Sequence, residues 1–483
     1  MTTIVGYSTE TTARLLCVFD AGGRTARIAY QDGAGTIGSL DVPVVTAEPY
    51  GLASFHLTGL VGPTLSYAVA DYANGSPPPD AVALLAGSTK TFRLPAPGPL
   101  RVALISCNDI DNHAFAKEQR GAMWRRLGKL VTNGEVDLLV HAGDQIYGDG
   151  DPVGWNAAEG RLAAYRRHYV NTWSNPDVAA VLSSCPSLMM WDDHEIYDGW
   201  GSNDNDVSAP AQQRFQAAAR AFRDFQDPLN PPDRLASGLA WLAQYGDLAI
   251  VAVDGRSQRK WASGTIMGKE QLDDFEVKLN ELAALQLKHL LVVVGTPPVY
   301  VPLIAAEKLA AVVSPASLDD IRDGWTASNN RAECRRFLMS LMNFAGFSPS
   351  TQVTIVAGDI HVGTLASIDT KLLFGENPNK KQPRIYQVTS SGIARPAPSG
   401  AEAFMLSLIT NGGAQDLFNQ DIQGALLKIN GSDHDYCVAH RNFAVLDPSD
   451  GHGNWDAHGN LWVKFHVELG AGKVLEQQLA KLA

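Results

Sequence analysis

Apolar runs that end in polar residues recur along the central part of this chain. Each run holds four or more apolar residues followed by polar ones, at 101–107, 136–144, 187–195, 248–257, 290–298 and 353–361. Nearly continuous apolar character, in place of strict alternation, is typical of strands that are buried on both faces. The runs therefore predict the strands of an α/β domain whose sheets are covered by helices.

The segments between these runs have the apolar spacing that is typical of helices. Between the first two runs, five apolar residues have the spacing of one helix face: Met123, Trp124, Leu127, Leu130 and Val131. Gly134 follows them as a stop signal. Further helices are expected near 157–182, 209–227, 269–286, 331–345 and 414–427. Strands that alternate with helices in this way predict βαβ units.

Residues 12–95 have a different pattern. Short runs rich in β-branched and aromatic residues are separated there by clusters of Gly, Pro, Asp and Asn, which is typical of a small all-β sandwich. The proline-rich segment 94–99, LPAPGP, cannot continue a strand ladder. We therefore predict an all-β sandwich domain over 1–97 and a catalytic α/β domain over 98–483. Two domains also suit a chain of 483 residues, because a single core stops growing at roughly 250–300 residues.

Composition narrows the classes of function and partner. The formal net charge of -12 repels polyanions, so we expect no nucleic-acid partner. Five scattered cysteines without a CxxC pair favour a reducing compartment over a disulfide framework. Neither a signal-peptide pattern nor an apolar stretch of membrane-spanning length is found. We expect a cytoplasmic protein without a membrane partner, or a periplasmic or secreted one if an export signal has been removed. The oligomeric state stays open.

Four of the predicted strands end in residues that bind metals. The ends are Ser106–Asp109 with Cys107, Gly143–Tyr147, Trp191–Glu195 and Gly358–His361. Ligands of open α/β sheets lie beyond the carboxyl ends of the strands, which is where these residues fall. Alone, a cysteine at a strand end is more often a core residue, and Asp or Tyr in a loop is more often solvated. Four such ends in one domain favour a metal site.

The third end, WDDHE, is the most informative. Asp192, Asp193 and His194 are consecutive and directly follow a buried run. Burying adjacent like charges costs several kcal/mol unless a cation or hydrogen bonds compensate. In the fourth end, Asp359 and His361 leave an extended segment on the same side, because side chains alternate along a strand. Both patterns predict side chains that face one cation cluster.

The order of the four motifs, SC, GDQIY, WDDHE and GDIH, resembles the PhoD-like branch of the calcineurin-type metallophosphoesterases. The resemblance covers nearly the whole chain, including the amino-terminal segment that begins VGYSTETTARL. It implies a metallophosphoesterase-type β-sandwich flanked by helices, preceded by a small immunoglobulin/fibronectin-like sandwich. It also implies hydrolysis of phosphoric esters, monoester, diester or both, by hydroxide that a two- or three-metal site activates.

The resemblance assigns roles to individual residues. The metal ligands it implies are Cys107, Asp144, Tyr147, Asp192, Asp193, Asp359 and His361. Asp144 would bridge the metals, and His194 would be the catalytic histidine. The implied cofactors are Fe³⁺ and Ca²⁺, with Mn²⁺ or Zn²⁺ as alternatives. Thiolate and phenolate ligands suit ferric iron and carboxylates suit calcium, so these ligand types are chemically consistent with the two ions.

The substrate is a small phosphate ester whose identity the sequence leaves open. The chain departs from the common family pattern at Ile360 and Asn108, near the positions expected to contact substrate. Asn108 and Arg256 are the candidate substrate-binding residues, although Arg256 is equally well explained as a structural partner of Asp254. Two other classes of function remain: a binding or regulatory protein with a decayed core, and a metallohydrolase that acts on another bond.

Overall fold

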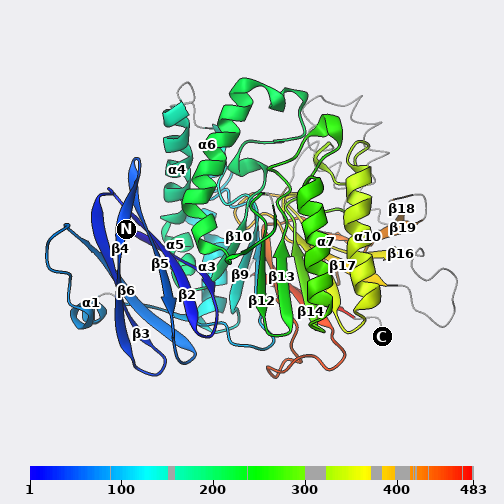
Figure 1. Cartoon of the computed structure of the whole chain (residues 1–483). Helices are drawn as coiled ribbons and strands as arrows, with labels where there is room; N and C mark the ends of the chain where they lie inside the picture. Colours follow the sequence, from blue (N-terminus) through cyan, green and yellow to red (C-terminus); the bar gives the residue numbers. More distant parts are fainter. Residues whose placement is uncertain are drawn as a thin grey trace.

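The computed structural model describes residues 1–483 except for 88, 151–157, 237, 300–321, 371–382, 398–413, 417, 419–420, 433, 470–471 and 481–483. Figure 1 shows a mixed α/β fold in which an amino-terminal β part lies beside α4, α5 and α6. Within the described residues the strands form three sheets. The expected α/β class with an all-β amino-terminal part is therefore confirmed.

The amino-terminal sheet is antiparallel throughout, with seven strands in the order β1-β2-β5-β4-β3-β6-β7. In chain order they are β1 (Thr2–Ser8), β2 (Thr12–Phe19), β3 (Arg24–Asp32), β4 (Ile37–Ala47), β5 (Tyr50–Thr58), β6 (Thr64–Tyr72) and β7 (Lys90–Arg93), with the short helix α1 (Ala81–Gly87) before β7. One core joins the two halves of the sheet, through residues such as Leu15, Ile28 and Phe92. Strand β1 precedes the segment 12–95 in which the short runs lie, and most side chains of β4 are at least partly exposed.

A six-stranded sheet carries three of the four predicted strand ends. Its order is β10 (Ser187–Met190), β9 (Leu138–Ala142), β8 (Val102–Ile105), β21 (Asn442–Asp447), β22 (Leu461–Val467) and β23 (Lys473–Leu479). The strands β8, β9 and β10 are parallel, and Ile105 pairs with His141 while Met190 pairs with Ala142. Their carboxyl ends therefore meet at one edge of the sheet.

The third sheet has ten strands and carries the fourth end. Its path is β11 (Asp233–Arg234), β12 (Trp241–Tyr245), β13 (Leu248–Ala252), β14 (His289–Val293), β15 (Gln352–Ala357), β17 (Arg384–Thr389), β16 (Gly363–Thr370), β19 (Ile422–Leu426) and β18 (Ala414–Asp416), and β20 (Cys437–Val438) pairs with β16. The strands β13, β14, β15 and β17 are parallel. Their carboxyl ends likewise share one edge.

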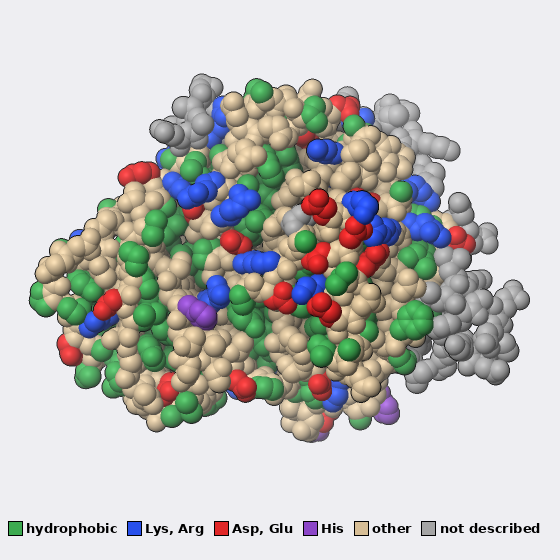
Figure 2. Space-filling view, viewed as in Figure 1, with side chains coloured by type: hydrophobic (Ala, Val, Ile, Leu, Met, Phe, Trp, Pro, Cys, Tyr) green, Lys and Arg blue, Asp and Glu red, His purple; other side chains and the backbone are tan. Residues whose placement is uncertain are grey.

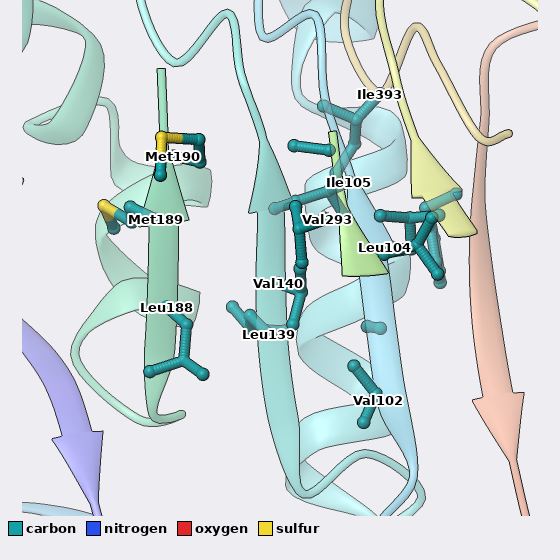
Figure 3. Close-up of a cluster of buried hydrophobic side chains, with 14 of the residues drawn as sticks. Val102, Leu104, Ile105, Leu139, Val140, Leu188, Met189, Met190, Val293 and Ile393 are labelled. Carbon is teal, nitrogen blue, oxygen red and sulfur yellow. The ribbon is translucent and has the colours of Figure 1, made fainter. Parts of the chain in front are cut away.

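The six-stranded and ten-stranded sheets share a core. In Figure 3, Val293 of β14 and Ile393 lie beside Ile105 of β8 and Val140 of β9, and all four side chains are at most 1% exposed. Burial of each such side chain contributes roughly 1.5–3 kcal/mol. A second core lies where α7 (Lys269–Ala283) and α10 (Arg331–Phe347) pack on the ten-stranded sheet.

Further helices pack against the first of these cores. They are α3 (Ala122–Thr132), α4 (Ala158–Trp173), α5 (Pro176–Leu182) and α6 (Ala209–Phe225), while the short helix α2 (Lys117–Arg120) before α3 buries no side chain. The helix expected over 157–182 is two helices, because Asn175 caps α5 and Pro176 stands at its first turn; residue 157 lies outside the described residues. The helix expected over 414–427 is wrong. Strands β18 and β19 lie there, since residues 422–426 alternate between buried and half-buried and Gly424 disfavours a helix.

Charged side chains on the face shown in Figure 2 are intermingled. Acidic and basic groups gather over α7 and α10, where Arg336 lies 2.7 Å from both Asp273 and Glu276. The net negative charge of the chain is thus not one uniform acidic surface on this face. Every helix in the described part of the chain is too short or too polar to span a lipid bilayer.

Candidate metal centre

The predicted ligands follow strands of two different sheets. Three predicted ligands come two residues after a strand of the six-stranded sheet ends. Cys107 follows β8, Asp144 follows β9 and Asp192 follows β10. Asp359 and His361 follow β15 of the ten-stranded sheet. Because parallel strands end at a common edge, each sheet presents its ligands on one side. The site is therefore built where the carboxyl edges of the two packed sheets meet.

The backbone at these strand ends adopts a conformation that side chains usually avoid. Only five non-glycine residues in the described part of the chain have positive φ, and four are predicted ligands: Cys107 (53°), Asp144 (56°), Asp359 (67°) and His361 (56°). A left-handed conformation costs roughly 1–2 kcal/mol per residue and persists where surrounding contacts enforce it. Such strain is concentrated at functional sites in proteins, so its location here supports a function for these four residues.

Cys107 connects three of the predicted motifs. Its Sγ donates to Asp144 Oδ2 at 3.2 Å and lies 2.9 Å from Ser391 Oγ. Ser391 Oγ in turn accepts a hydrogen bond from the backbone N–H of His361 at 2.8 Å. Cys107 is therefore buried but faces polar groups, and the segments that follow β8, β9 and β15 converge on it.

The carboxylates converge as well. Asp144, Asp193 and His194 offer ligand atoms that lie within 4.8 Å of one another, and so do Asp192, Asp193 and Asp359. Asp193 belongs to both groups, so the two groups are adjacent. Burial, followed by repulsion from neighbouring carboxylates, raises the pKa of Asp144 and Asp359 well above the ordinary value. A cation between these groups would remove the repulsion.

The rings of His194 and Tyr147 are in contact beside the carboxylates, tilted by 34°. Their ring centroids are 4.1 Å apart. The Nδ1 atom of His194 lies 2.5 Å from Asp149 Oδ2, an ion pair when the imidazole is protonated. Burial lowers the pKa of His194, but the charge of Asp193 and the hydrogen bond with Asp149 outweigh burial and raise it to about 10. His194 is thus held as a proton-carrying group.

Glu195 ties the second and third motifs together. Its carboxylate accepts backbone N–H groups from Asp144 at 2.9 Å, Gln145 at 2.6 Å and Asp192 at 2.8 Å. Gln226 Nε2 donates to it at 3.1 Å. A carboxylate with four donors holds both loops in one geometry, so Glu195 supports the site without facing it.

Four buried polar atoms at the site have no hydrogen-bond partner: Asp144 Oδ1, Tyr147 Oη, Asp192 Oδ2 and His361 Nε2. Leaving a buried polar atom unpaired costs about 1–3 kcal/mol, so proteins rarely keep several together without a ligand. Burial and then Arg395 lower the pKa of His361 to about 3, which keeps its imidazole neutral and able to bind a metal. The residues present therefore fit bound metal ions.

Asn108 and Arg256, the predicted substrate-binding residues, have protein partners here. Asn108 Oδ1 accepts from Trp124 Nε1 at 2.8 Å. Arg256 is 1% exposed, and its guanidinium donates to Asp192, to Asp193 at 3.3 Å and to Asp323 at 2.6 Å and 2.7 Å. Its contact with Asp254 is through the backbone N–H. Substrate binding by either residue stays a prediction.

Several residues of the site were not predicted from the sequence. Asp149 pairs with His194, Ser391 contacts Cys107, and Asp323 pairs with both Arg256 and Arg259. Arg395 lies over the ring of Tyr147, 5.0 Å from its centroid. Asp149 closely follows the second motif in the sequence, which was a usable signal. The other residues lie outside every motif, and only the fold brings them to the site.

Known proteins are similar to this chain in fold and in sequence. The chain resembles a solved structure of PhoD, with a TM-score of 0.62 at 14% identity over 100% of this chain and 92% of that one. A structure of the Plasmodium inner-membrane-complex anchor GAP50 gives a TM-score of 0.42 at 11% identity, over 80% of this chain and 90% of that chain. An uncharacterized protein of Saccharomyces cerevisiae is 22% identical over 66% of this chain, and the chain spans 61% of that relative's length. The PhoD-like phosphatase family matches residues 102–403, and the chain therefore belongs to that family.

Proposed function

We propose that this chain hydrolyses phosphoric esters at a site that holds two or three metal ions between its six-stranded and ten-stranded sheets. The observation that carries the proposal is the convergence of four unpaired buried polar atoms at the carboxyl edges of both sheets. Membership of the PhoD-like phosphatase family supports a phosphoesterase-type function. The proposal includes the metallophosphoesterase-type arrangement that the sequence resemblance implies, and the packing of two sheets with outer helices supports it.

The donor types divide into two sets. Cys107, Asp144, Tyr147 and His361 would hold one ion, and their thiolate, phenolate and imidazole groups suit ferric iron. Asp193 and Asp359, with Asp192, would hold the second ion, and their carboxylate oxygens suit calcium. Asp144 lies near both sets, because its ligand atoms approach Cys107 and Asp193. When bound, the metals supply activation of water and neutralisation of charge on the phosphate.

The chain's own residues supply positioning and a proton. His194 carries a proton beside Asp149 and contacts the ring of Tyr147, so it can donate to the leaving oxygen as the ester bond breaks. Burial of Cys107, together with the charge of Asp144, raises the pKa of its thiol well above the ordinary value. The thiolate therefore forms only when a cation compensates, which couples this residue to metal binding.

Elemental analysis of the purified protein beside two assays tests the proposal. The assays use an aryl phosphate monoester and a bis-aryl phosphate diester. Iron and calcium in the protein together with turnover of either ester is the expected result. A protein that binds no metal and turns over neither ester would contradict the proposal and favour the binding or regulatory class. Turnover with other metals would keep the reaction and revise the assignment of the ions.

A further inference from the structure

A loop that follows β17 places an arginine, Arg395, beside the metal centre. The backbone N–H of Ile393 donates to Ser106 O at 3.1 Å, and that of Arg395 donates to Cys107 O at 3.1 Å. These bonds attach the loop to the end of β8, directly beside a predicted ligand. The position of Arg395 is therefore determined by the same backbone that positions Cys107.

One part of the Arg395 guanidinium is hydrogen-bonded to the protein, and another part is exposed to solvent. Its Nη1 donates to Asp109 Oδ2 at 2.7 Å, and its Cζ lies 5.0 Å from the centroid of the Tyr147 ring. The side chain is 34% exposed, in contrast to 1% for Arg256. Among the described residues, no acceptor other than Asp109 takes a hydrogen bond from this guanidinium. It therefore has N–H groups available to an incoming anion.

The carboxylate of Asp109 fixes the orientation of this arginine. Its Oδ2 accepts from Asn112 Nδ2 at 2.6 Å as well as from Arg395, and its side chain is 16% exposed. An exposed surface ion pair adds little to protein stability, because each side chain loses rotamer freedom when the pair forms. Here Asp109 is largely buried and already oriented by Asn112, so the arginine is preorganised.

We propose that Arg395 binds a non-bridging oxygen of the substrate phosphate, and that Asp109 is the positioning residue for its guanidinium. The inference rests on the proposed function and identifies the group that recognises the phosphate at that site. Arginine suits this role because its planar fork matches phosphate oxygens and because its charge is retained at every working pH. The guanidinium lies over the ring of Tyr147 and the backbone N–H of Arg395 is bonded to Cys107 O, so its charge stands beside two predicted ligands.

The test measures binding of inorganic phosphate to the metal-loaded protein, by calorimetry and by competitive inhibition of aryl phosphate hydrolysis. We expect Arg395→Gln to weaken phosphate binding roughly 10- to 100-fold, with bound metals and thermal midpoint unchanged, because one charged hydrogen-bond donor is lost. Arg395→Lys keeps the charge without the fork and should recover part of the affinity.

A double-mutant cycle tests the positioning role of Asp109. Asp109→Asn should weaken phosphate binding less than Arg395→Gln does, and should raise KM more than it lowers kcat. In the Arg395→Gln background, the Asp109→Asn change should have no further effect on phosphate binding, since the group that Asp109 positions is gone. Independent, additive losses from the two changes would overturn the positioning role.

Arg384 provides a matched control on the strand that precedes this loop. It is the first residue of β17, is 35% exposed, and pairs with Asp369 at 2.7 Å, so its exposure and pairing distance are close to those of Arg395 with Asp109. Arg384→Gln should leave phosphate binding unchanged. If the parent protein binds phosphate and turns over ester while Arg395→Gln behaves like Arg384→Gln, the inference is overturned and the proposed function stands. If the metal-loaded parent does neither, both fall together.

Discussion

The carboxylate of Glu195 accepts the backbone N–H of Asp144 at 2.9 Å, across 51 residues of sequence. The same carboxylate also accepts from Gln145 and Asp192. The loop after β9 and the loop after β10 are therefore bound to one buried side chain. Since Asp144 has a φ of 56°, this contact helps to maintain a backbone conformation that is unfavourable by itself.

Removal of Glu195 should loosen the metal centre. Glu195→Ala leaves three backbone N–H groups without their acceptor, each at a cost of about 1–3 kcal/mol. We expect a lower thermal midpoint and fewer metal ions per chain, measured by melting curves and elemental analysis. Glu333 is a matched control, because it also accepts three backbone N–H groups, from Ile266, Met267 and Gly268. Glu333→Ala should lower the midpoint and leave the metal content intact; equal metal content in both variants would contradict the prediction.

Substitution of Cys107 should remove one ion specifically. We expect Cys107→Ala to lose iron and hydrolysis of an aryl phosphate, and Asp144→Asn to do the same, because both groups approach the same position. Cys185→Ala is the control, since Cys185 is equally buried but lies in the core near α5. That change should lower the free energy of unfolding only by the cost of a small cavity. Full activity in Cys107→Ala would exclude this residue from the mechanism.

The pairing of His194 with Asp149 predicts a shift of the pH profile. Asp149 raises the pKa of His194, so Asp149→Asn should lower it and move the alkaline limb of kcat to lower pH. The rate should fall about 10- to 100-fold, as for other residues that orient a functional group. Asp198 lies 3.9 Å from His194 Nε2 with its side chain 65% exposed, so Asp198→Asn should change the profile little. An unchanged pH profile in Asp149→Asn would show that Asp149 does not control the pKa of His194.

The sequence predicted the strand ends well and their connections poorly. Cys107, Asp144, Asp193 and Asp359 follow apolar runs, and both the run and its polar end are local features of the sequence. Residue contacts across the fold are not local.

Arg395 reaches Asp109 over 286 residues and carries no motif, so no pattern could assign it to the site. The error at 414–427 has a similar origin. Pairing with β16 determines strand β19, and a single-sequence pattern does not contain the partner strand.

A glycine makes room for Asp192 at the centre of the site. Gly143 has a φ of 90°, and a Cβ atom there would lie 2.4 Å from Asp192 Cβ. Gly143→Ala should displace Asp192 and reduce the affinity for the second ion, measured by calcium titration. Gly23→Ala tests backbone strain alone, because Gly23 has a φ of 75° and no atom within 4 Å of the added methyl group. Both variants should lose stability, and only Gly143→Ala should lose metal affinity; equal calcium affinity would show that Asp192 tolerates the methyl group.

Metal removal should weaken the loss of stability that acid causes. Burial raises the pKa of Glu195 to about 7 and that of Asp192 to about 6 in the metal-free protein. Between about pH 4.5 and 7 these two carboxyl groups hold more protons in the folded state than in the unfolded state, so their contribution to the free energy of unfolding increases as the pH falls. Burial lowers the pKa of His361 to about 3 and that of His141 and His466 to about 4, so these histidines contribute in the opposite direction below about pH 6.5, with and without metal. A bound cation instead favours the ionised carboxylate of Asp192, and the metal-loaded protein should lose stability as the pH falls because protons displace the metals. A change from pH about 7.5 to about 5 should therefore lower the melting midpoint less with chelator than without it. An equal or larger drop in the chelated protein would show that these carboxyl groups do not carry their protons in the folded state.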